Sequence, residues 1–169
     1  MDAKSRRDFI IKKLIQSNKP IKGIDFAKDF GVTRQIIVKD IALLRAKGNN
    51  ILATPDGYII MNEESKIKSI IAVNHDNDKM KDELECVIKY GGTIEDVIVE
   101  HPIYGEIKGI LMIKNLNDLN KFMKKNEESG AKPLSELTDG VHLHTISTYS
   151  KEDMECIKEE LKNKGFMII

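Results

Sequence analysis

The four histidines of this 169-residue chain all follow residue 70, and two of them alternate in His142-Leu-His144. A strand that carries histidines at positions i and i+2 points both imidazoles to one face, about 6.5–7 Å apart along the chain. Two such rings can approach one metal ion at roughly 2.0–2.1 Å each. His75 and the following Glu83 could add a nitrogen and a carboxylate oxygen, a ligand set that suits Zn, Ni, Fe or Mn.

Spacing alone leaves a plainer interpretation open. A His-X-His pair is commonly an exposed strand face, and histidines far apart in a sequence usually have unrelated roles. The segment His101-Pro-Ile-Tyr-Gly105 likewise fits an ordinary turn between two strands. In such a turn Pro102 would fix the backbone dihedral φ, and Gly105 would adopt a turn conformation without steric cost.

The segments around these histidines alternate in type and predict one domain over residues 66–169. It follows a short polar interruption, Glu63-Glu64-Ser65-Lys66, and is expected to be an α/β or α+β sandwich. Two of its helices carry buried stripes, at Leu84, Val87, Ile88 and at Met154, Ile157, Leu161. We predict strands at 67–75, 93–101, 105–113, 141–148 and 166–169, with helices at 78–90, 116–129 and 151–164.

Residues 1–62 predict three short helices followed by a β-hairpin. Ser5 precedes a helix that ends near Asn18, and a second helix, about 23–30, stops at Gly31, which easily adopts the left-handed conformation. Thr33 can cap the third helix, and Asp56-Gly57 is a hairpin turn between strands near 51–54 and 57–61. The expected buried side chains are Phe9, Ile10, Leu14, Ile15, Ile24, Phe26, Ala27, Ile37, Ile41 and Leu44. This order predicts a winged helix-turn-helix.

The start of the third helix carries side chains that suit the major groove of DNA. Arg34 and Gln35 can pair bidentately with guanine or adenine edges, while Lys39, Arg45 and the basic residues of the first helix would neutralise phosphates. Residues 1–62 hold 12 Lys or Arg and 6 Asp, whereas the remainder holds 15 basic and 21 acidic residues. A basic module beside an acidic one favours DNA binding. The alternative is a protein-interaction module whose charges are merely solvated.

The stretch Gly31–Gly48, followed by Ile51–Tyr58, closely resembles the biotin-repressor type of winged helix. The resemblance covers nearly all of residues 4–60 and implies a DNA-binding domain in which Thr33 opens the recognition helix. A complete biotin repressor is not expected, because neither a ligase domain nor a glycine-rich adenylate-binding loop follows in the sequence.

The segments Ile94–Glu106 and Pro133–Thr145, with the spacing from His75 to Glu83, look like the three-histidine domain of the niacin-responsive repressors of NAD synthesis. The likeness spans almost all of residues 66–169. It implies an α+β chain whose second domain is similar to the histidine-containing phosphocarrier fold. It also implies a homodimer, nicotinic acid as co-repressor, and a divalent metal at His75, Glu83, His142 and His144. Tyr90 stands where an acidic residue is common in the family, which affects only a neighbouring surface.

We therefore expect a cytoplasmic repressor, not an enzyme, that binds operator DNA as a homodimer and controls genes of NAD synthesis or niacin uptake. The carboxylate of the pyridine acid would meet the metal, with His101 or Tyr104 near the ring. The alternatives are a metal-dependent hydrolase with an activated water, a phosphocarrier with His101 as phosphoryl acceptor, and a related repressor with another effector.

Two further expectations concern cysteines and membranes. Cys86 and Cys156 lie in predicted helices and are expected to be packing residues rather than a disulfide, as in a reducing cytosol. No apolar run approaches the roughly 20 residues that a membrane span needs, so we expect neither insertion nor export.

Overall fold

The N-terminal residues fold into three helices and a β-hairpin in the computed structural model, which describes residues 2–17, 19–60 and 66–168. The helix-turn-helix order predicted from the sequence is present, and the turn between the second and third helices is made at Gly31, in the left-handed region at φ 63°. The elements are α1 (Ala3–Gln16), α2 (Gly23–Phe30), α3 (Arg34–Ala46), β1 (Ile51–Thr54) and β2 (Gly57–Ile60).

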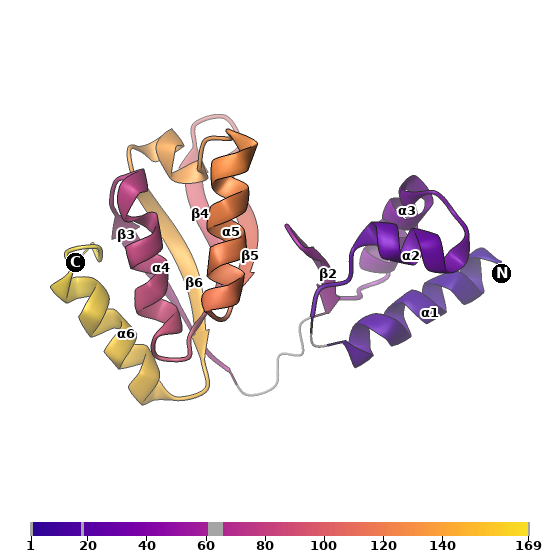
Figure 1. Cartoon of the computed structure of the whole chain (residues 1–169), viewed down its shortest axis with the longest axis horizontal. Helices are drawn as coiled ribbons and strands as arrows, with labels where there is room; N and C mark the ends of the chain where they lie inside the picture. Colours follow the sequence, from indigo (N-terminus) through magenta and orange to yellow (C-terminus); the bar gives the residue numbers. More distant parts are fainter. Residues whose placement is uncertain (1, 18, 61–65, 169) are drawn as a thin grey trace. The chain divides into compact units, whose positions relative to one another are not determined.

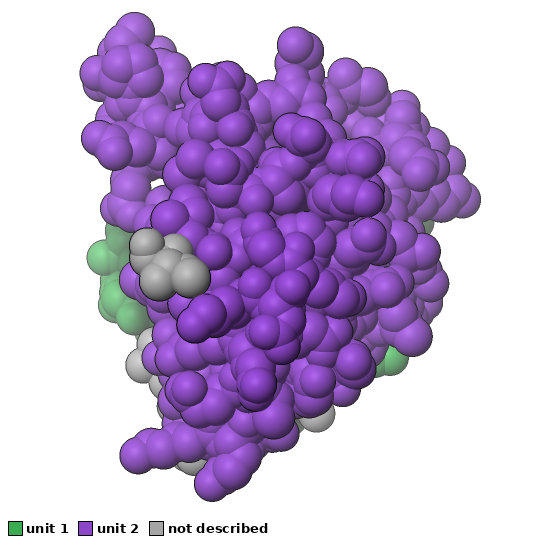
Figure 2. All heavy atoms as spheres, turned by 90° about the vertical axis from the view of Figure 1, so that its left-hand side faces the viewer, with its two compact units in different colours: residues 1–63 green, residues 64–169 purple. Residues whose placement is uncertain are grey.

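The chain divides into two compact units, Met1–Glu63 and Glu64–Ile169 (Figure 2). The boundary predicted near residues 63–66 falls mostly outside the described residues, so its position stays a prediction. The predicted last residue of the wing, Met61, also lies outside them. Among the residues that are described, no helix is both long and apolar enough to cross a membrane.

Side-chain caps fix where α1 and α3 begin. Thr33 accepts a hydrogen bond from the Ile36 backbone N–H at 3.4 Å, so its predicted capping role is confirmed. The first helix begins earlier than expected, because Asp2 caps it by accepting from the Ser5 backbone N–H at 2.8 Å. Ser5 therefore lies inside α1 and does not precede it.

The core of the N-terminal unit is narrower than the apolar pattern predicted. Phe9, Ile15 and Ile24 were expected to be buried but are 44–54% exposed. A three-helix unit this small covers only a thin strip of each helix, and in α1 that strip consists of Arg6, Ile10 and Leu14. The main buried apolar cluster consists of Ile10, Leu14, Phe26, Ala27, Ile37, Ile41, Leu44 and Ile51.

The hairpin forms the predicted wing. β1 and β2 pair antiparallel with Thr54 opposite Gly57, which leaves a two-residue turn. Gly57 has φ 135°, and a Cβ at this position would overlap the backbone of Ile21. Tyr58 exchanges backbone hydrogen bonds with Ile21 at 2.8 and 2.9 Å, so the segment before α2 is tied to the wing.

The C-terminal unit is a four-stranded antiparallel sheet with strand order β3-β6-β4-β5, covered on one face by α4, α5 and α6 (Figure 1). Its core joins strand residues such as Ile71 and Ile146 to helix residues such as Leu84 and Ile157. The predicted α+β class is confirmed. The elements are β3 (Ile67–Asn74), η1 (Asn77–Lys79), α4 (Met80–Ile88), β4 (Thr93–His101), β5 (Gly105–Ile113), α5 (Leu116–Ser129), η2 (Leu134–Thr138), β6 (Val141–Thr148) and α6 (Lys151–Asn163).

Three expectations for this unit were wrong in detail. The predicted strand 166–169 is reduced to an isolated bridge between Met167 and Val73 on the outer edge of β3, with residue 169 outside the described range. The predicted helix 78–90 is shorter, since a 3-10 turn precedes α4. Cys86 is buried, but Cys156 is exposed because it lies off the stripe that α6 buries; both are free thiols.

Candidate functional site

The central strand β6 carries two of the candidate metal ligands on its helix-covered face. His142 pairs with Val73 and His144 with Ile71, and paired residues of antiparallel strands share a face. Val73 and Ile71 belong to the core beneath the helices, so both imidazoles point into the same layer. The alternation predicted from the sequence is therefore present, and both histidines are buried.

Helix α4 supplies a carboxylate from the middle of its apolar stripe. Met80, Glu83, Leu84 and Val87 follow helical spacing and are all buried. Glu83 is only 1% exposed. An ionised carboxylate is costly in such a place unless cations or hydrogen-bond donors surround it. The helix thus delivers one negative charge to the interior of the unit.

The third histidine reaches the cluster because two backbone segments approach closely. His75 directly follows the last residue of β3. Gly140, just before β6, has φ 93°, and a Cβ there would lie 2.7 Å from the His75 carbonyl oxygen. Only a glycine allows this approach together with this backbone conformation.

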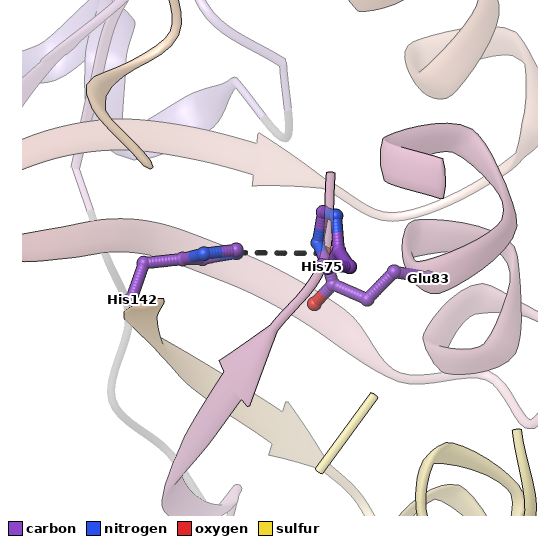
Figure 3. Close-up of side chains that lie close together, drawn as sticks. All are labelled: His75, Glu83 and His142. Carbon is purple, nitrogen blue, oxygen red and sulfur yellow. Dashed lines mark hydrogen bonds and ion pairs between the residues drawn. The ribbon is translucent and has the colours of Figure 1, made fainter. Parts of the chain in front are cut away.

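Glu83 lies at the centre of the three imidazoles. Its Oε2 is 2.8 Å from Nε2 of His75 and 3.7 Å from Nε2 of His142, and its Oε1 is 3.2 Å from Nε2 of His144. Figure 3 shows His75, Glu83 and His142 pointing toward one another. Ligand atoms of these three residues all lie within 4.8 Å of one another. His144 is outside this tightest group but contacts the other carboxylate oxygen.

Backbone carbonyls hold the outer nitrogen of every ring. The Nδ1 atoms of His75 and His142 lie 2.8 Å from the carbonyl oxygens of Asp76 and Gly140, respectively. Nδ1 of His144 lies 2.5 Å from the carbonyl oxygen of Asp96. A carbonyl can only accept, so each Nδ1 donates its hydrogen and a neutral ring presents the lone pair of Nε2 to the cluster.

The cluster favours a positive charge between its members. Burial opposes ionisation of Glu83, but the attraction of His144 and hydrogen bonds from the histidines outweigh it and keep the pKa of Glu83 well below its usual value. Burial also opposes protonation of His144, yet the attraction of Glu83 raises the pKa of that imidazole. The pKa of His75 is raised against burial by its hydrogen bond to Glu83. A proton or a metal ion can supply the missing charge.

One buried oxygen gives a direct test of whether these residues fit a metal. Within the described part of the chain, Oε1 of Glu83 has no hydrogen-bond partner, although Nε2 of His144 lies 3.2 Å from it. A buried carboxylate oxygen without a donor is costly, and a bound cation would relieve it. Imidazole nitrogens with a carboxylate oxygen are the donors of borderline divalent metals. The residues present therefore fit such an ion.

His101 and Tyr104, expected near the effector, are not among the described residues that surround Glu83. They close the turn between β4 and β5, where Nδ1 of His101 accepts from the backbone N–H groups of Ile103 and Tyr104. Tyr104 is 74% exposed. β4 runs antiparallel to β6 with Ile98 opposite Leu143, so this turn lies at the end of the sheet where β6 begins.

All five candidate DNA-binding residues are exposed on or beside α3: Thr33, Arg34, Gln35, Lys39 and Arg45. Two of the basic residues of α1 bind a buried carboxylate. Arg6 and Arg7 were expected to contact phosphates, but their side chains bind Asp40 at 2.6 and 3.2 Å. That carboxylate is 4% exposed, so this pair of arginines serves the fold of the unit.

Comparison with known proteins follows the same division of the chain. Residues 6–59 match an HTH domain model and residues 68–169 match a 3H domain model. The chain is 46% identical to the probable transcription repressor NiaR of Thermotoga maritima, over 94% of this chain and 91% of that protein. It is 35% identical to the transcription repressor NadR of Bacillus subtilis, over 97% and 93%. The chain belongs to the NiaR/NadR family of transcription repressors.

A third relative is a longer protein, and only a small part of it matches this chain. An uncharacterized protein of Methanothermus fervidus is 30% identical over 77% of this chain but only 22% of that protein. Membership of a repressor family with an HTH domain confirms the prediction of a DNA-binding repressor rather than an enzyme. The hydrolase and phosphocarrier alternatives receive no support from these relatives.

Sequence reasoning about the repressor missed the ion pair at Asp40 and the carbonyl partners of the histidines. A signal for the first was present, because Asp40 interrupts the stripe of Ile37, Ile41 and Leu44 and so required a buried cation. The carbonyls of Asp76, Gly140 and Asp96 had no such signal. Every residue carries a carbonyl, and only the folded backbone decides which one a ring meets.

Proposed function

We propose that this repressor senses nicotinic acid through a divalent transition metal, such as Zn, Ni, Fe or Mn, held by His75, Glu83, His142 and His144. It would act in the cytoplasm on operators of NAD biosynthesis or niacin uptake genes. The observation that carries the proposal is a buried carboxylate facing three Nε2 atoms while each Nδ1 is held by a carbonyl. The resemblance to niacin-responsive repressors supplies the effector.

A bound ion would supply the positive centre that attracts the carboxylate of a pyridine acid. His101 and Tyr104 are proposed to contact the ring, since their turn lies at the end of the sheet where β6 begins. Metal analysis of the purified protein, with nicotinic acid titration of operator binding before and after chelation, tests the proposal. A metal-free protein with an undiminished response to nicotinic acid would contradict it.

Arg34→Ala and Gln35→Ala are each expected to weaken binding to the preferred operator by about 1–3 kcal/mol, because these exposed side chains begin the recognition helix. Lys39→Ala should instead weaken binding to all sequences alike, with a salt slope smaller by about 1. Fluorescence titration at several salt concentrations, on an operator selected from random duplexes, separates the two effects. Unchanged operator affinity for both of the first two variants would remove them from the base-contacting surface.

A two-fold symmetric homodimer is the expected DNA-binding species. One recognition helix contacts only a few base pairs, and palindromic half-sites require two-fold symmetry. We place the dimer interface in the C-terminal unit, because no coiled coil is present in the described residues of the chain. Light scattering of the full chain should give the mass of two copies, both free and on operator DNA. A monomer under both conditions would rule this arrangement out.

A further inference from the structure

The outward face of α3 carries an apolar side chain among its polar and basic ones. Val38 is 42% exposed. It follows Arg34 by four positions and Gln35 by three, so the three side chains share one helix face and Val38 lies one turn further along. A different face of the helix packs in the core, through Ile37, Asp40, Ile41 and Leu44. Val38 therefore stands on the surface that would enter the groove.

Neither packing nor helix formation accounts for a valine at this position. A β-branched residue is less favourable in a helix than alanine, because its χ1 rotamers are restricted. Its exposed surface also gains nothing from the core of the unit. The next two turns present Ala42 and Ala46, both exposed. Small side chains there let the helix lie close to a surface in front of it.

We propose that Val38 contacts the C5-methyl group of thymine and so sets the specificity of the repressor at one base pair of each half-site. The proposal rests on the proposed contacts of Arg34 and Gln35 with base edges. The only apolar group that a base edge shows in the major groove is the thymine methyl. Val38 is an apolar side chain beside two side chains that suit guanine and adenine edges, so it can make an apolar contact with that methyl group.

The same helix offers a matched control. Leu43 is 41% exposed, nearly the same as Val38. Five residues separate the two side chains, which turns Leu43 about 140° around the helix axis from Val38. Leu43→Ala therefore removes an equally exposed apolar side chain from α3 without touching the face that holds Val38. Both truncations to alanine favour helix formation or leave it unchanged, so both variants should fold.

The test uses the full-length protein and an operator selected by it from random duplexes. Each thymine is replaced in turn by deoxyuridine, which removes only the methyl group. At one thymine of each half-site, the replacement should weaken wild-type binding about fourfold, the affinity equivalent of one buried methylene. The same replacement should leave Val38→Ala unaffected and should still weaken Leu43→Ala about fourfold.

The possible results separate this proposal from the one it rests on. If the wild type selects no sequence at all, base recognition by α3 fails, and the role of Val38 fails with it. If a sequence is selected but no methyl matters, only the role of Val38 is overturned. An equal loss in the wild type and in Val38→Ala would also overturn it, because another side chain would then hold the methyl. Circular dichroism melting confirms that both variants are folded.

Discussion

Replacing His142 and His144 together by alanine should abolish both metal retention and the response to nicotinic acid, while operator binding without effector persists. The two rings supply Nε2 atoms from one strand, and without them only His75 and Glu83 remain of the cluster. A co-repressor must bind the DNA-competent state more tightly, with a coupling of usually about 1–3 kcal/mol. The variant should lose completely the increase in operator affinity that nicotinic acid causes.

The measurements are metal content by elemental analysis and operator affinity by titration with and without nicotinic acid. Leu143→Ala is the matched control, because that residue lies between the two histidines on the other face of the same strand and is only half-buried. A triple variant that adds Glu83→Gln removes the unpaired charge and separates loss of metal from loss of folding. If the double variant lost its metal but kept the full effector response, the metal would have only a structural role.

Asp40→Ala should lower the stability of the N-terminal unit by about 3 kcal/mol or more, since removal of one partner leaves a buried guanidinium without its counter-charge. Arg6 binds this carboxylate from α1 at 2.6 Å, and the side chains are 11% and 4% exposed. Hydrogen exchange of backbone amides in α1 and α3 reports the stability of this unit alone. A loss of 3 kcal/mol corresponds to roughly 150-fold faster exchange.

An exposed ion pair in the same unit provides the control. Lys13 and Asp29 join α1 to α2 with side chains that are 42% and 46% exposed. Pairs of this kind contribute at most about 1 kcal/mol, so Asp29→Ala should change exchange by no more than about fivefold. Equal effects of the two substitutions would show that burial of Asp40 adds nothing to its interaction with the arginines.

The sequence predicted those features that depend on neighbours along the chain. The cap at Thr33, the turn at Gly57 and the shared face of His142 and His144 all follow from spacing within a few residues. Glu83 could also be placed, because it lies on the helix after His75 and the family resemblance pointed to it. Local chemistry was enough for most of the elements, whereas the grouping of His75 and Glu83 with the two histidines of β6 was expected from the family resemblance.

What failed depended on partners far away in the sequence. Hydrophobic periodicity extended the predicted buried face of α1 to Phe9 and Ile15, but the buried strip is only Arg6, Ile10 and Leu14, and Arg6 binds the carboxylate of Asp40. Hydrophobic periodicity does not predict that an arginine is buried in the core. The predicted last strand is reduced to one bridge, between Met167 and Val73, although Phe166 and Ile168 also make backbone hydrogen bonds to β3.

The candidate ligands come from three elements, the end of β3, helix α4 and strand β6, which only the folded unit brings together. An unfolded chain keeps no such cluster, so an ion held there binds the native state alone. At a free concentration one hundred times its Kd, that ion would add about 2.7 kcal/mol to the free energy of unfolding. The amount of intact repressor in a cell would then follow the supply of the metal, because a chain starved of it unfolds more often and meets proteases more often.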